Sequence, residues 1–140
     1  MNEIVVAFAP RASARARRAA EAKVAAPRRY PARIARQVSL AFSLRRRLER
    51  GEFDDFATMA RALGFTRARI TQLMDLLLIA PEVLEEVLFL ELPAGPQPLS
   101  ERALRDTLCR LVEWREQRAA WEGLKAGSVA ASTDRKEAQP

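Results

Sequence analysis

One stretch of the chain, residues 56–75, constrains the fold more than any other: FATMARALGFTRARITQLMD. Its first half carries apolar side chains at α-helical spacing, namely Phe56, Met59, Ala60 and Leu63. Asp54 or Asp55 can cap the start of this helix through a side-chain oxygen. Gly64 follows directly and can adopt the left-handed conformation that ends a helix without a steric penalty. The pattern predicts a short helix followed by a tight turn.

The second half of this stretch predicts another helix, from Arg67 to about residue 79, with Thr66 as its N-cap. Its buried face should consist of Ile70, Leu73, Met74 and Leu77. Two short helices joined by a tight turn form a helix-turn-helix, and small Ala60 would allow them to cross closely. We therefore predict an all-α fold, a small helical bundle that contains a helix-turn-helix. An ordinary helical hairpin within a larger bundle is the alternative.

Composition divides the chain into three predicted segments. Residues 1–31 are rich in Ala, Arg and Pro but hold few large apolar side chains, so we expect a disordered basic arm. Residues 32–122 should form the helical domain. Residues 123–140 are small and polar and are expected to form a short disordered tail.

Further helices are expected on both sides of the helix-turn-helix. Residues 32–50 predict a helix that Gly51 ends, and its apolar face should contain Ile34, Val38, Ala41, Phe42 and Leu48. Pro81 suits the first turn of a following helix, because proline lacks the N–H that is unpaired there. After the break at PAGPQP, Ser100 is expected to cap one last helix that runs to about residue 124.

Several classes of function have no support in the residues. The chain has no histidine, one cysteine (Cys109) and no grouped glycines, so we expect no enzyme activity, no catalytic residues, no metal site and no cofactor. Cys109 lies in an apolar helical pattern and is expected to be a buried structural thiol. No apolar run is long enough to span a membrane, and the first residues lack a signal-peptide pattern, so a cytoplasmic protein without membrane contact is expected.

The distribution of charge points to a polyanion as the partner. The net charge is +6, and residues 11–50 hold thirteen Lys and Arg against two acids. Residues 51–91 instead hold three arginines against eight acids, so the helix-turn-helix itself is not basic. If the chain binds DNA, the arm and the helix over 32–50 must supply much of the attraction to phosphate.

The segment ATMARALGFTRARITQLMDLLLIAPEVLEEVL resembles the central DNA-binding region of the ParB/KorB partition and repressor proteins. The chain is also similar to small helix-turn-helix proteins found beside recombinase genes on bacterial mobile elements, which share its basic entry helix and a WREQR-like element. The resemblance covers about residues 32–122. The larger family's nucleotide-binding domain and long dimerisation domain have no counterpart here, so CTP-dependent clamp loading is not expected.

This resemblance implies sequence-specific binding of double-stranded DNA. The chain would act as a transcriptional repressor, or as an accessory protein of plasmid or mobile-element maintenance or recombination. A recombinase and a second copy of the chain are further candidate partners, with residues 104–121 as the candidate dimer helix. The alternative is a helical protein-interaction module that holds a recombinase or transcription partner.

A helical wheel assigns roles to individual side chains. The face opposite the predicted core of the second helix, with the residues at its start, should read bases: Thr66, Arg67, Ala68, Thr71, Gln72 and Asp75. Gln72 can pair with an adenine edge and Arg67 with a guanine edge. Contacts to the DNA backbone are expected from Arg33, Arg36, Arg46, Arg47 and Arg69. Trp114 and Trp121 could complete the core or form a surface for a partner.

Overall fold

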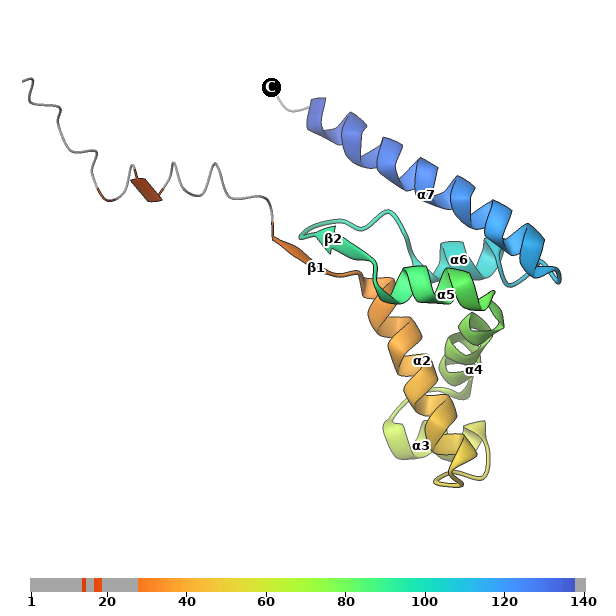
Figure 1. Ribbon diagram of the computed structural model, residues 1–140. Coiled ribbons are helices and arrows are strands. Elements are labelled where there is room, and N and C mark those ends of the chain that lie inside the picture. The colour runs from red at the N-terminus through yellow and green to blue at the C-terminus, as the bar shows by residue number, and fades with distance from the viewer. Residues whose placement is uncertain (1–13, 15–16, 19–27, 138–140) are drawn as a thin grey trace, which may run out of the picture.

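The computed structural model describes residues 14, 17–18 and 28–137, and side chains up to residue 128. Most of the predicted basic arm therefore lies outside the described residues. The elements are mainly helical, as predicted, and follow the order β1 (Arg29–Pro31), α2 (Arg33–Glu49), α3 (Phe56–Leu63), α4 (Arg67–Asp75), η1 (Leu76–Leu78), α5 (Pro81–Leu88), β2 (Glu91–Pro93), α6 (Glu101–Thr107) and α7 (Trp114–Glu137). Figure 1 shows α2, α3 and α4 at one end of the molecule, with α5, α6 and α7 at the other.

The helix-turn-helix forms over the predicted residues because three local signals agree. Asp55 Oδ1 accepts a hydrogen bond of 2.7 Å from the Thr58 N–H and caps α3. Gly64 ends α3 with φ 72° and ψ 26°, the left-handed conformation that favours glycine. Thr66 Oγ1 accepts a 3.1 Å bond from the Arg69 N–H and caps α4. A turn of three residues thus separates the two helices.

The core of this motif agrees with the prediction in part, because Met74 and Leu77 of the predicted buried face are only partly buried. Met59 and Ala60 on α3 are buried against Ile70 and Leu73 on α4. Leu73 and Ile70 have no exposed surface, so each contributes about the 1.5–3 kcal/mol expected from a fully buried aliphatic side chain. The helix after the turn is shorter than predicted, because α4 ends at Asp75 and the chain tightens into the 3₁₀ turn η1.

Helix α2 packs along the motif through one face: Ile34, Ala35, Val38, Ala41 and Leu44. Gly51 follows α2 with φ 73°, as expected for the end of a helix. Phe42 was predicted to share the buried face, but 41% of it is exposed. Phe42 lies on the same side of α2 as the buried Ala35, seven residues earlier, but it lines an open groove together with Leu77 and Leu78.

A short antiparallel pair of strands corrects the predicted limit of the arm at residue 31. Arg29 pairs with Pro93, Tyr30 with Leu92 and Pro31 with Glu91. The Ala32 N–H continues the pairing by donating to the Leu90 carbonyl at 2.9 Å. Composition favoured disorder here, but the partner strand lies some sixty residues away and supplies backbone hydrogen bonds that no local pattern reveals.

The predicted single helix over 101–124 is two helices, and the predicted tail starts too early. Ser100 caps α6 as expected, with Oγ accepting a 3.1 Å bond from the Ala103 N–H, but α6 ends at Thr107. The chain then turns before α7 begins at Trp114, and α7 stays helical through Glu137. In Figure 1, α7 runs past α5 and α6, and its later turns extend away from the other helices.

Two side chains of α7 fix it to the domain and explain the break before it. Gln117 is buried, and its Oε1 accepts a 2.6 Å bond from the Ala80 N–H at the start of α5. Trp121 is also buried, and its Nε1 donates to Glu86 Oε2 at 2.8 Å. A continuous helix from Glu101 could not place both α6 and these two side chains on the same core. Hydrogen bonds from Lys125 and Trp121 hold the pKa of Glu86 below its usual value.

The tryptophans therefore divide between the two predicted roles. Trp121 belongs to the core, which also includes Leu76, Ile79, Val83, Val87, Leu104 and Leu108. Trp114, at the start of α7, is 53% exposed. Among the described residues, no helix combines the length and the apolar character needed to cross a membrane.

Candidate nucleic-acid interface

The outer face of α4 carries the side chains predicted to read bases. Thr66, Arg67, Ala68 and Thr71 are all exposed, because the opposite face of α4 supplies Ile70 and Leu73 to the core. Thr71 Oγ1 donates to the Arg67 carbonyl at 3.2 Å, which orients this hydroxyl along the helix. The start of α4 thus presents Thr66 and Arg67 beside backbone N–H groups, and this combination is suited to binding an anion.

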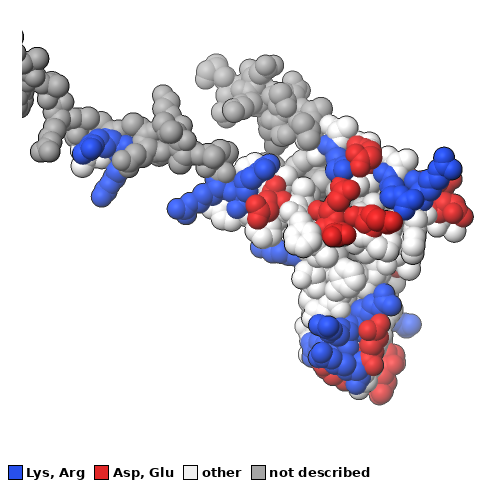
Figure 2. All heavy atoms as spheres, viewed as in Figure 1, with Lys and Arg blue, Asp and Glu red and all other residues white. Residues whose placement is uncertain are grey.

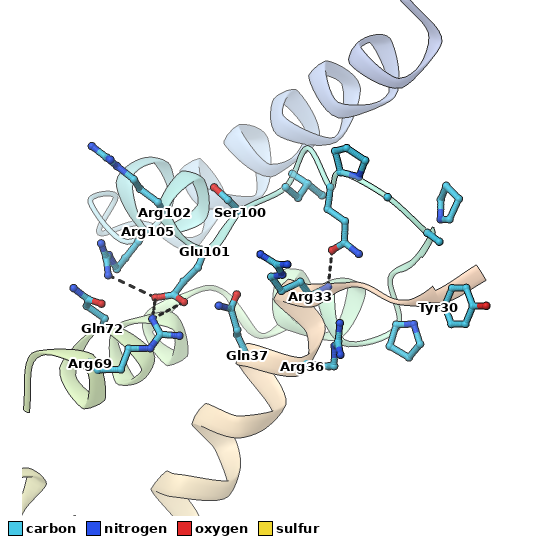
Figure 3. Close-up of a pocket in the computed structure, with 17 residues that line it drawn as sticks. Tyr30, Arg33, Arg36, Gln37, Arg69, Gln72, Ser100, Glu101, Arg102 and Arg105 are labelled. Carbon is cyan, nitrogen blue, oxygen red and sulfur yellow. Dashed lines mark hydrogen bonds and ion pairs between the residues drawn. The ribbon is translucent and has the colours of Figure 1, made fainter. Parts of the chain in front are cut away.

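A cleft of about 1000 Å³ opens beside α4. Its walls come from α2, α4, α6, the strand β1 and the loop that follows β2. Five arginines line it: Arg33, Arg36, Arg69, Arg102 and Arg105. One carboxylate, Glu101, lies among them, so the lining has a net positive charge. Figure 3 shows Arg69 and Arg105 meeting at Glu101, with Gln72 beside Arg69, whereas the Arg102 side chain points away from this group.

An ion pair joins α4 to α6 across this cleft. Arg69 Nη1 lies 2.7 Å from both carboxylate oxygens of Glu101, and Arg105 Nη1 lies 3.7 Å from Glu101 Oε1 (Figure 3). The Glu101 side chain is only 11% exposed, so both arginines are held in place. Arg69 was predicted to contact a phosphate, but part of its guanidinium is already bound to this carboxylate. The ion pair between Arg69 and Glu101 instead holds α4 against α6.

The structure brings together only some of the predicted backbone contacts. Arg33 and Arg36 reach the cleft from the first turns of α2. Arg46 and Arg47 lie near the other end of α2, where Arg47 Nε donates to Glu52 at 2.7 Å and its guanidinium lies 4.9 Å from the Phe53 ring centroid. These two arginines are therefore not part of the cleft.

Arg102 and Arg105 were not predicted as site residues. Both lie on α6, one turn apart, and both face the cleft. The sequence carried a signal for them, since two arginines three residues apart share one side of a helix that starts at Ser100. What it lacked was the placement of α6 beside α4.

Asp75 occupies the end of α4 opposite to Thr66 and is partly buried. The Cys109 thiol donates to the Asp75 carbonyl at 3.2 Å. Burial, and next the Asp75 carboxylate, raise the pKa of Cys109 to about 11. Cys109 is half-buried and protonated at neutral pH, which agrees with the predicted structural thiol only in part. Of the six predicted base-reading residues, Asp75 and Gln72 are the two that are only partly exposed.

Charge on the remaining surface is unevenly distributed. Figure 2 shows acidic side chains gathered over α5, which contains Glu82, Glu85 and Glu86. Basic and acidic side chains mix at the end of the molecule formed by α3 and the last turns of α2. Within the described residues, no group of His, Cys, Asp and Glu has the arrangement of a metal site.

Comparison with known proteins finds no matching family model, no similar curated protein and no similar solved structure.

Proposed function

We propose that this chain binds double-stranded DNA in a sequence-specific manner through α4. The observation that carries the proposal is the pairing of two features: an outer face of α4 that takes no part in the core, and an arginine-lined cleft beside it. The resemblance to ParB/KorB helix-turn-helix domains supports the same function. The cellular role would be that of a repressor, or of an accessory protein of plasmid or mobile-element maintenance or recombination.

Roles within the interface follow from chemistry and position. Arg67 is exposed at the start of α4, the end of a recognition helix that usually enters the major groove, and its planar guanidinium matches the two acceptors of guanine. Gln72 lies two turns from Thr66 at the edge of the cleft, where its amide can pair with an adenine edge. Arg33, Arg36 and Arg102 are exposed around the cleft and suit phosphates.

Selection of bound sequences from a random DNA pool tests the proposal. We expect enrichment of one short motif, with Arg67→Ala and Gln72→Ala each costing about 1–3 kcal/mol on the best site and relaxing one position of it. Arg36→Ala should instead weaken all sequences alike and lower the salt dependence by about one counterion. Arg115→Ala removes an exposed arginine of α7 outside the cleft, so it is the matched control and should change neither property. An unenriched pool would contradict the proposal.

A protein-interaction module is the second candidate function. It is favoured by a separate apolar groove on α5, η1 and the start of α7, where Leu78 and Trp114 are exposed. The two functions are compatible, because this groove and the arginine-lined cleft share no lining residue. Binding to a recombinase or transcription protein without any DNA selectivity would favour this second candidate.

A further inference from the structure

A second concave surface, of about 490 Å³, lies outside the arginine-lined cleft. We call it the apolar groove, and its lining is Phe42, Arg45, Leu77, Leu78, Ile79, Pro81, Leu84, Glu85, Leu88 and Trp114. Helices α2 and α5 supply its charged residues, and the uncharged residues come from α2, η1, α5 and the start of α7. Figure 2 shows uncharged surface between the acidic side chains over α5 and the basic side chains at the end of α2.

Three large apolar side chains in the groove remain in contact with solvent. Leu78 is 62% exposed, Trp114 is 53% exposed and Phe42 is 41% exposed. Nearby residues in the chain, such as Leu44 and Ile79, are buried and belong to the core. The core therefore does not account for these three exposed side chains. Contiguous exposed apolar surface of this kind marks a contact with another macromolecule.

The charges of the groove indicate which macromolecule. Arg45 lies on the α2 side and Glu85 on the α5 side, so the same surface carries one cation and one anion. Arg45 Nε also bonds Glu49 at 2.8 Å, but this pair is more than half exposed and leaves other guanidinium N–H groups available. A two-fold axis through such a surface pairs opposite charges twice, because residue i of each copy meets residue j of the other.

We propose that the apolar groove is the interface of a two-fold symmetric homodimer, in which Arg45 of one copy meets Glu85 of the other and Leu78 of each copy enters the opposite groove. The segment that the sequence predicts as the dimer helix, residues 104–121, is interrupted between α6 and α7, and it buries Gln117 in its own domain. The groove instead offers exposed apolar side chains beside complementary charges.

The groove lies where it would not compete with a ligand on α4. Leu77 and Leu78 follow the C-terminal end of α4, whereas Thr66 and Arg67 lie at its N-terminal end. Nine helical residues, at 1.5 Å each, separate the two ends by roughly 13 Å. The dimer itself stands without the proposed function; only its use in presenting two α4 helices to two DNA half-sites rests on that function.

Sedimentation velocity of the full chain without DNA, over a concentration series, tests the dimer. We expect a monomer–dimer equilibrium for the unchanged protein. Leu78→Glu should weaken the association roughly tenfold or more, because a charge would enter an apolar contact. Phe89→Glu is the matched control, since Phe89 is 80% exposed but lies outside the groove, and its association should be unchanged. Circular dichroism establishes that both variants fold.

Charge exchange tests the two-fold pairing itself. Arg45→Glu and Glu85→Arg should each weaken self-association by roughly tenfold or more, because each homodimer then contains two like-charge contacts. An equimolar mixture of these two variants should recover association, since the crossed pairs in the heterodimer are again opposite in sign.

Three results would overturn the proposal: a monomer at every concentration, equal effects of Leu78→Glu and Phe89→Glu, or no recovery in the mixture. Because DNA is absent throughout, these results are independent of whether the chain binds DNA.

Discussion

Gln117 offers a quantitative test of how α7 is held to the domain. Its side chain is 2% exposed and makes three hydrogen bonds to backbone groups. Oε1 accepts from the Ala80 N–H at 2.6 Å, and Nε2 donates to the carbonyls of Leu111 at 2.9 Å and Leu78 at 3.3 Å. The network fixes the amide orientation, because an N–H needs an acceptor and two carbonyls need a donor.

We predict that Gln117→Ala lowers the free energy of unfolding by about 2–4 kcal/mol. Ala80 has no exposed surface, so its N–H would lose its partner where water cannot replace it, at a cost of about 1–3 kcal/mol. The two bonds to carbonyls add about 0.5–1.5 kcal/mol each at most, and less where water reaches the exposed Leu78. The measurement is urea unfolding followed by circular dichroism at equilibrium.

Gln97→Ala is the matched control. Gln97 Oε1 also accepts a 2.6 Å bond from a backbone N–H, that of Arg33, but this bond is exposed. Water can take the place of the lost oxygen there, so we expect a loss below about 1 kcal/mol. Equal losses for the two variants, or a loss below about 1 kcal/mol for Gln117→Ala with an unchanged m-value, would refute the argument from burial.

Three further predictions concern single residues. Gly64→Val should destabilise the domain by about 1–2 kcal/mol in thermal unfolding, and Gly64→Asn by less: a Cβ at φ 72° meets no neighbour within 4 Å, so only the backbone conformation is strained. Cys109 should react with iodoacetamide at pH 8 about two orders of magnitude more slowly in the folded than in the unfolded chain, because its pKa is raised to about 11; equal rates would show an ordinary thiol. The Thr58 N–H lowers the pKa of Asp55 below its usual 3.8, so its stabilising effect is present above pH 3.8 and is lost as pH falls through the lower, folded value. Asp55→Asn should therefore reduce the loss of thermal stability between pH 5 and strongly acidic pH, and an unchanged acid profile would contradict the role of this cap.

The elements that the sequence predicted well are those specified by neighbouring residues. Asp55, Gly64 and Thr66 each act within four residues of their own position, so a local pattern is enough to locate α3, the turn and α4. The strand pair, by contrast, depends on a segment sixty residues away. The break between α6 and α7 depends on where Gln117 and Trp121 find hydrogen-bond partners, and these partners lie on η1, at the start of α5 and within α5.

The candidate interface shows the same division between local and tertiary information. Helical periodicity was sufficient to place Thr66, Arg67 and Thr71 on one outer face. Because residues 51–91 hold an excess of acids, the sequence predicted that positive charge near α4 comes from the arm and from residues 32–50. Arg33 and Arg36 do line the cleft beside α4, whereas the contribution of α6 was not predicted. Residues that contribute charge to α4 come from α2 and α6, which lie about thirty residues before and after it in the chain.

Glu101 shows why charge has to be counted in space. It is the one carboxylate in the lining of the arginine-rich cleft, and it binds Arg69 of α4 as well as lying near Arg105 of its own helix. Removing it would leave two partly buried guanidinium groups facing each other. The same carboxylate that reduces the net charge of the cleft thus holds α6 against α4, and so keeps Arg102 beside the helix proposed to read DNA.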